Sequence, residues 1–159
     1  MSGKDAIPPR SPRHWRMAVF SGIGACLAIL LLQGLAELIH QPLLLAPFGA
    51  SCVLLFLVPS SEFSRMRNLL AGYAIGTVAG FAVLWLWPGE WWSVALAVGS
   101  TIGLMRLTHS VHPPAGAHPI VIVLSAPALK TMLPSLALGL GVLLLSAWGY
   151  HRLLQRPSV

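Results

Sequence analysis

The sequence has few charged residues, and acidic ones are the rarest. Only 9% of its 159 residues are charged, and Asp and Glu together number four. A soluble domain carries about a quarter charged residues, so the composition excludes an ordinary water-soluble fold. Asp5 lies in the N-terminal tail, Glu62 and Glu90 lie between apolar runs, and Glu37 lies at the end of one. With no carboxylate inside an apolar run, a cation site or an acidic proton relay lacks ligands.

Cysteines and enzyme signatures are also scarce. Cys26 and Cys52 lie inside apolar runs without the spacing of metal ligands, which predicts small core residues. There is no GxSxG, HExxH or Walker motif and no paired carboxylates. Ser51 or Cys52 beside His112 could form a nucleophile and a base, but no acid orients them. We therefore expect no enzyme, no catalytic residue, no cofactor and no bound metal.

Long apolar runs make up most of the chain, and 56% of its residues are hydrophobic. The apolar segments cover residues 17–38, 43–58, 69–87, 91–107, 111–125 and 131–150. The first is long enough to cross a bilayer as an uncleaved helix. These runs predict an all-α membrane protein with one transmembrane domain over 15–152. A disordered basic tail is expected over 1–14 and a short tail over 153–159.

The basic residues predict the orientation in the membrane. They lie in short stretches between apolar runs, so the net charge of +6 does not indicate a nucleic-acid partner. If all six segments cross from a cytoplasmic N-terminus, nine of the ten Lys and Arg lie inside and only Lys130 lies outside. If 43–58 and 111–125 only enter the membrane and return, six of these basic residues lie inside and four lie outside. The positive-inside rule thus predicts six crossings of a bacterial cytoplasmic membrane, with both termini cytoplasmic.

Two of the segments are too short to cross as whole helices. Segments 43–58 and 111–125 would cover roughly 23 Å as α-helices, against a hydrocarbon core of about 30 Å. Each carries proline and glycine, in PFGAS at 47–51 and PPAGAH at 113–118. A residue before proline avoids the helical region, and proline favours the first helical position. We therefore expect Ala46 and His112 to be extended, with helices starting near Pro47 and Pro114.

The two short segments belong to an internal repeat. Shifting the sequence by 67 residues places PFGA at 47–50 on PAGA at 114–117. Each half, about 17–87 and 91–150, then consists of a helix, a broken helix and a helix. Three crossings per half turn the second half upside down relative to the first. Inverted repeats whose broken half-helices meet near the bilayer midplane are typical of transporters.

Such an arrangement would aim two helix N-termini at one region. Each terminus carries roughly half a positive charge and unpaired N–H groups, which would attract a small monovalent anion. Glycine would let the ion approach the main chain, while Ser51 and His112 would offer an O–H and a ring N–H. Because imidazole titrates near neutral pH, His112 could gain a proton with the anion. The predicted substrate-binding residues are Pro47, Gly49, Ala50, Ser51, His112, Pro113, Pro114, Gly116 and Ala117.

Other roles for the histidines remain open. His112 can equally be a structural pin that bonds carbonyls freed by the proline break. His118 would lie on the first turn of the second half-helix. A transition-metal site built from His109, His112 and His118 is a further alternative, although no Cys, Asp or Glu supports it.

Glycines recur at helical spacing in two of the segments. Small residues at this spacing let helices approach closely. We expect them to pack helices within the protomer, or to form the interface of a homo-oligomer. The two series are Gly72, Gly76 and Gly80, and Gly99 and Gly103.

The two proline motifs resemble the HPP family of integral membrane proteins. THSVHPPAGA at 108–117 contains the His-Pro-Pro motif that names the family. APFGASCVLLF at 46–56, PSS at 59–61 and RN at 67–68 resemble further family elements, and the resemblance covers roughly 15–152. The chain departs from the family at His118-Pro119, where an uninterrupted small or apolar run is usual. Pro119 is expected to kink the half-helix or to delay its start.

The resemblance implies a transporter or channel for a small monovalent anion. Nitrite is the leading substrate, since plant members of the family are associated with nitrite transport across the chloroplast envelope. The family is commonly described with four transmembrane helices, fewer than the six crossings predicted here. A rival from another class is a membrane-embedded ligand-binding or regulatory subunit without transport. A transition-metal carrier that uses histidines is the further alternative.

Overall fold

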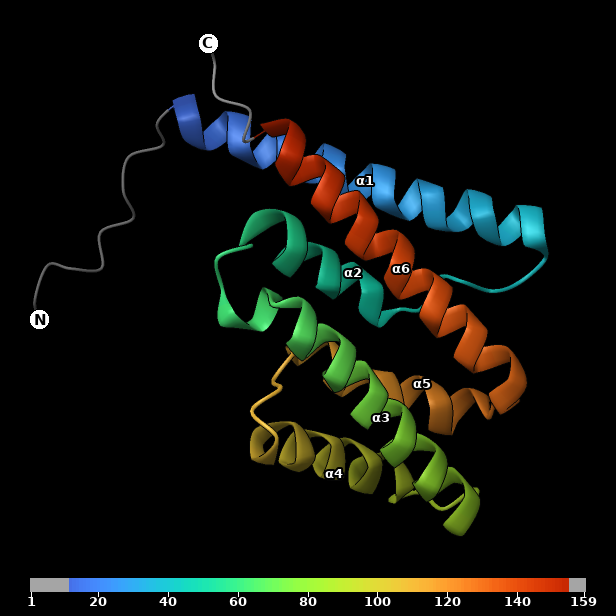
Figure 1. Cartoon of the computed structure of the whole chain (residues 1–159). Helices are drawn as coiled ribbons and strands as arrows, with labels where there is room; N and C mark the ends of the chain where they lie inside the picture. The colour runs from blue at the N-terminus through green and yellow to red at the C-terminus, as the bar shows by residue number, and fades with distance from the viewer. Residues whose placement is uncertain (1–11, 155–159) are drawn as a thin grey trace, which may run out of the picture.

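The computed structural model describes residues 12–154, and within them every element is helical (Figure 1). The α-helices are α1 Pro12–Ile39, α2 Pro47–Cys52, α3 Met66–Leu86, α4 Ser93–Leu107, α5 His118–Ser125 and α6 Leu129–Leu154. A π-helix, η1 Val53–Leu57, continues α2, and the 3-10 helices are η2 Glu62–Ser64 and η3 Pro113–Ala117. Of the two predicted tails, 1–11 and 155–159 lie outside the described residues. α1 already begins at Pro12, inside the stretch predicted to be disordered.

Length and apolar composition make the chain a membrane protein. Helices Trp15–Ile39, Met66–Leu86 and Leu129–Leu154 are long and apolar enough to cross a membrane, and shorter apolar helices cover Pro47–Leu57, Ser93–Leu107 and Pro113–Ser125. The short length of 93–107 was not predicted. Apolar side chains of α1 face outward, with Leu31 and Leu38 59% and 77% exposed. Cys52 is buried as predicted, but Cys26 is exposed on α1, so its prediction as a core residue is wrong.

Successive helices run in opposite directions (Figure 1). The start of α1, the turn 58–65, the connection 108–112 and the end of α6 all lie at one end of the molecule. The connections 40–46 and 126–128 lead in from the other end. Both short segments therefore run from one end to the other and do not return to the end they left.

The first broken segment follows the expected proline chemistry only in part. Its helix starts at Pro47 as predicted, after a stretch over 43–45 that is not helical. Ala46, however, is helical, with φ −50° and ψ −40°, so the prediction that it is extended is wrong. The reason is a turn already formed across the proline, in which the Phe48 N–H donates to the Leu45 carbonyl at 2.9 Å.

The second broken segment starts in two steps. His112 is extended as predicted, with φ −132° and ψ 97°. The 3-10 helix η3 begins at Pro113, and the α-helix begins only at His118, with Pro119 in its first turn. Pro119 thus delays the α-helix, as expected from its missing N–H.

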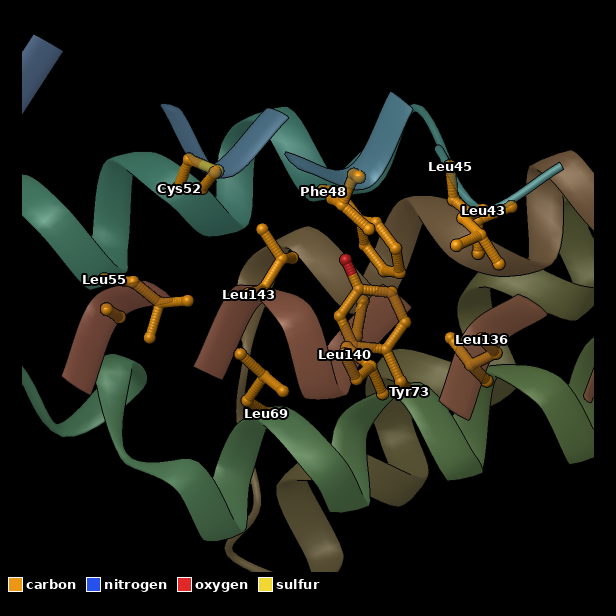
Figure 2. Packing of buried hydrophobic residues seen from close by; sticks show 14 of the residues in the cluster. Leu43, Leu45, Phe48, Cys52, Leu55, Leu69, Tyr73, Leu136, Leu140 and Leu143 are labelled. Atoms are coloured by element: carbon orange, nitrogen blue, oxygen red, sulfur yellow. The ribbon is translucent and has the colours of Figure 1, made fainter. Parts of the chain in front are cut away.

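The core lies between α2, α3 and α6, where Phe48 contacts Tyr73 edge to face at a centroid distance of 5.5 Å (Figure 2). Glycines of α3 bring η3 and α5 close. A Cβ added to Gly76 would lie 3.0 Å from the Ala115 carbonyl oxygen. This confirms the predicted packing role of the α3 series, the residues Gly72, Gly76 and Gly80. Gly99 and Gly103 do not pack helices within the protomer, since an added Cβ would meet nothing within 4 Å, and for them the alternative of a homo-oligomer interface stays a prediction.

Candidate functional site

A chain of hydrogen bonds joins the two broken segments. Ser51 Oγ lies 2.9 Å from His112 Nε2 and 2.9 Å from the Tyr73 hydroxyl. His112 Nδ1 lies 2.8 Å from the carbonyl oxygen of Phe63. Ser51, Tyr73 and His112 are fully buried, and Figure 2 shows Tyr73 rising from α3 with its hydroxyl toward α2. Because buried polar groups destabilise a fold unless paired, this chain holds α2, α3 and η3 together.

The Phe63 carbonyl decides where the protons lie. A carbonyl only accepts, so His112 Nδ1 carries the hydrogen and donates it. In the neutral ring Nε2 then accepts from the Ser51 O–H, and the Ser51 oxygen accepts from the Tyr73 O–H. Both ring nitrogens of His112 are used, which leaves no free N–H for a bound anion. In this arrangement His112 acts as a structural pin.

Nearby side chains hold the turn 58–65, which carries the carbonyl that accepts from His112. Ser61 Oγ accepts from the Phe63 N–H at 3.2 Å, and Asn68 Nδ2 donates to the Glu62 carbonyl at 2.9 Å. These two residues belong to the PSS and RN elements of the sequence. They fix the loop between η1 and α3 so that the Phe63 carbonyl faces the imidazole.

Side chains also satisfy the π-helical end of the first broken segment. The Leu55 carbonyl accepts from His151 at 2.7 Å and the Phe56 carbonyl from Ser21 at 2.9 Å. The single Ser64 hydroxyl proton is shared between the carbonyls of Leu54 at 3.0 Å and Val58 at 2.8 Å. A bilayer core offers no water for this purpose, so such carbonyls need protein donors. His151 is therefore part of the structural framework.

A second polar pair lies on the other side of Tyr73. The Thr77 hydroxyl donates to the Tyr73 carbonyl at 2.8 Å, and Thr77 Oγ1 lies 3.0 Å from His118 Nε2. Because the Thr77 proton is already used, His118 Nε2 is the donor and His118 Nδ1 carries a lone pair. Nδ1 has no hydrogen-bond partner, although His118 is fully buried. The Tyr73 ring centroid lies 5.7 Å from that of His112 and 5.3 Å from that of His118.

The first N–H groups of the broken helices are not free. Those of Phe48 and Gly49 donate to carbonyls of the preceding turn. Pro113 and Pro114 have no N–H, and the N–H of Ala115 donates to the carbonyl just before the prolines. The expectation that these N–H groups are unpaired is therefore wrong. Proline removes some donors, and the preceding turns use the others.

A cavity of about 760 Å³ lies between α4, η3, α5 and the turn before α3. Arg106, His109, Glu62 and Asn68 supply its polar groups, and apolar side chains such as Ile102 line the rest. A volume of this order is typical of small-molecule sites. Arg106 is the cationic group in the wall, and the Glu62 carboxylate reduces the local positive potential.

The structure divides the predicted binding residues among separate places. Ser51 and His112 are joined in the hydrogen-bond chain, as expected for residues of one site. Three residues line the cavity: Pro113, Gly116 and Ala117. Pro47 and Pro114 are buried, Gly49 and Ala50 are exposed, and Gly49 lines a separate hollow beside α1.

The three histidines proposed as a metal site are not gathered around one point. Within the described part of the chain no group of three or more His, Cys, Asp or Glu side chains could hold a metal ion. His112 bonds Ser51 and Phe63, while His118 bonds Thr77.

Sequence reasoning missed two residues of the buried junction, Tyr73 and Thr77. The sequence does contain a signal for them. A tyrosine and a threonine four residues apart inside an apolar run share one helix face, which indicates a buried polar contact. It also missed the role of Arg106, since nothing in the local sequence shows that a cavity opens beside it.

Apolar helices of alternating direction, two broken segments and a buried polar junction define a multi-pass helical membrane protein. The chain belongs to the HPP transmembrane family, whose model, described as "HPP, transmembrane region", matches residues 10–159.

Two curated transmembrane proteins of Dictyostelium discoideum are similar to this chain. One is 34% identical over 131 residues, covering 77% of this chain and 45% of that protein. The other is 37% identical over 87 residues, covering 52% of this chain and 28% of that protein. The chain thus spans less than half the length of these relatives. No solved structure matches it.

Ser51→Ala is expected to destabilise the protein more than Tyr73→Phe. Alanine leaves two buried groups unpaired, His112 Nε2 and the Tyr73 O–H, and each unpaired group costs about 1–3 kcal/mol. Phenylalanine removes one donor and leaves the bond between Ser51 and His112 in place, so a loss of about 1 kcal/mol is expected. Unfolding of the purified protein in detergent measures both variants. Equal losses, or a larger loss for Tyr73→Phe, would contradict the central position of Ser51 in the hydrogen-bond chain.

Proposed function

We propose that this protein transports a small monovalent anion across the bacterial cytoplasmic membrane, with nitrite as the leading substrate. The observation that carries the proposal is the cavity of about 760 Å³, which has Arg106 in its wall and reaches Gly116 and Ala117 of η3. The choice of nitrite rests on the family alone.

Arg106 supplies the attraction that the helix N-termini do not. It lies in the last turn of α4, with His109 close by in the same wall. The buried polar side chains of the described chain belong to Ser, Thr, Asn, His and Tyr, so no buried carboxylate repels an anion. An anion would therefore gather at the cavity wall before it moves inward.

The 3-10 helix η3 separates the cavity from the buried junction. His112 precedes it and His118 follows it, while Gly116 and Ala117 line the cavity. Hydrogen bonds in a 3-10 helix have poorer geometry than those in an α-helix, and such stretches often mark hinges. Opening of η3 would connect the cavity with the interior in an alternating-access cycle.

Two inverted repeats, about 17–87 and 91–150, would support such a cycle. Support comes from the alternating helix directions and from the broken segment in the middle of each half (Figure 1). In transporters built this way, substrate sites lie near the midplane between the repeats, at broken helices. The proposal includes half-helices that meet near that plane, and both termini in the cytoplasm.

Cysteines introduced one at a time test this orientation, in a background with Cys26 and Cys52 replaced by alanine. Arg65→Cys and Arg106→Cys should react with a membrane-impermeant thiol reagent from the cytoplasmic side. Lys130→Cys should react from the opposite side, because it starts α6 at the other end. Labelling of all three from one side would contradict the six crossings.

Transport fits the buried junction better than catalysis does. Ser51 and His112 have the spacing of a nucleophile and a base, but both are fully buried. The other ring nitrogen of His112 bonds a carbonyl and not a carboxylate. A substrate would have no access to the serine, so we propose that the protein is not an enzyme.

Nitrite uptake into proteoliposomes tests the function. Native protein should take up nitrite faster than empty vesicles do. At low nitrite, Arg106→Gln should lower the initial rate by roughly fivefold, as expected for ~1 kcal/mol from a partly exposed charge. Glu62→Gln should raise the rate, because it removes the opposing charge. Lys130→Gln, outside the cavity lining, is the matched control and should leave the rate unchanged.

Each failure of this experiment has a distinct meaning. Uptake by native protein no faster than by empty vesicles removes the transport proposal. Saturable nitrite binding without uptake would favour a ligand-binding subunit. A stoichiometric metal in the purified protein would favour a metal carrier.

A further inference from the structure

We propose that His118 takes up a proton together with the anion, which makes transport proton-coupled. The inference rests on the proposed function and deepens it. It starts from the unpaired nitrogen of a fully buried imidazole, His118 Nδ1. Within the side chains that the structure describes, Ser135 Oγ is the other buried polar atom without a partner.

The unpaired nitrogen distinguishes His118 from His112. A buried acceptor without a donor costs about 1–3 kcal/mol, so its retention needs a reason. The bond to Thr77 at 3.0 Å fixes the ring with Nε2 as donor, and Nδ1 is left as the free basic position. His112 has no such position, because Ser51 and the Phe63 carbonyl use both of its nitrogens.

The groups around His118 decide what could pair with a protonated imidazole ring. The titratable groups on the elements around α5 include Arg67 and Tyr73 on α3, with the Tyr73 ring beside that of His118, and His112 before η3. α4 contributes Arg106, which lies in the cavity wall with His109. No Asp or Glu is buried in the described part of the chain to pair with an imidazolium.

A single buried charge is strongly unfavourable. A proton alone and an anion alone are therefore both disfavoured in this interior. An imidazolium N–H bonded to an anion forms a charge-assisted pair and avoids the isolated charge. Each ligand then raises the affinity for the other, and the coupling is reciprocal.

The cavity lining ends one residue before His118 in the sequence. Ala117 lines the cavity, and His118 is the next residue along the chain. The opening of η3 that the proposed function requires would bring the anion and Nδ1 together. The carried species is then the anion with one proton, and no net charge moves.

The variant His118→Gln separates this role from a structural one. The glutamine amide can donate to Thr77 in place of Nε2 but does not titrate. An inwardly directed proton gradient should accelerate nitrite uptake by native protein. His118→Gln should take up nitrite down its gradient more slowly than native protein and should lose the acceleration. His40→Asn, an exposed histidine outside the cavity and the buried junction, is the control and should respond to the gradient like native protein.

The outcomes separate the inference from the function on which it rests. Acceleration of His118→Gln equal to that of native protein overturns the proton role and leaves transport intact. The proton role is also overturned, with transport intact, if the rate of nitrite uptake by native protein does not depend on the proton gradient. Should the variant fail to fold, native protein mixed with nitrite in weak buffer should take up protons from solution. No proton uptake on nitrite binding would overturn the inference.

Discussion

Inside a bilayer every backbone N–H and C=O group needs a protein partner, and a helix broken by proline loses some of its own. This chain meets the requirement with side chains from distant elements. His112 donates to the Phe63 carbonyl, and Ser21, Ser64 and His151 donate to carbonyls of η1. Ser51 then joins α2 to His112 and to the Tyr73 hydroxyl. Several polar side chains of an otherwise apolar chain thus bond the segments where its helices break.

This constraint distinguishes the two buried histidines beside η3. His112, in the motif that names the family, has both nitrogens occupied and joins η3 to α2. His118 lies just beyond the same 3-10 helix and keeps one nitrogen unpaired. The cavity beside Arg106 lies against the irregular segment between them. This hydrogen-bonded junction next to a less regular cavity wall is the arrangement on which the proposed transport, with a moving η3, rests.

Much of the fold is predictable from the sequence, because hydropathy gives the helices and proline gives the breaks. The start at Pro47 and the extended His112 follow from local chemistry alone. The helical Ala46 does not, since it depends on a turn that forms before the proline. The pairing of Ser51 with His112 across 61 residues is only implied by the repeat. Tyr73 and the cavity depend on tertiary packing, which no local pattern reports.

The central claim is that a neutral His112 donates from Nδ1 and accepts at Nε2 inside the membrane domain. Nitrogen-15 NMR of histidine-labelled protein in lipid bilayers tests it directly, with the His112 signals assigned by their loss in His112→Asn. The account predicts a protonated Nδ1 and an unprotonated Nε2 at neutral pH, with the Nε2 signal shifting in Ser51→Ala. A ring protonated at Nε2, or at both nitrogens, would contradict it.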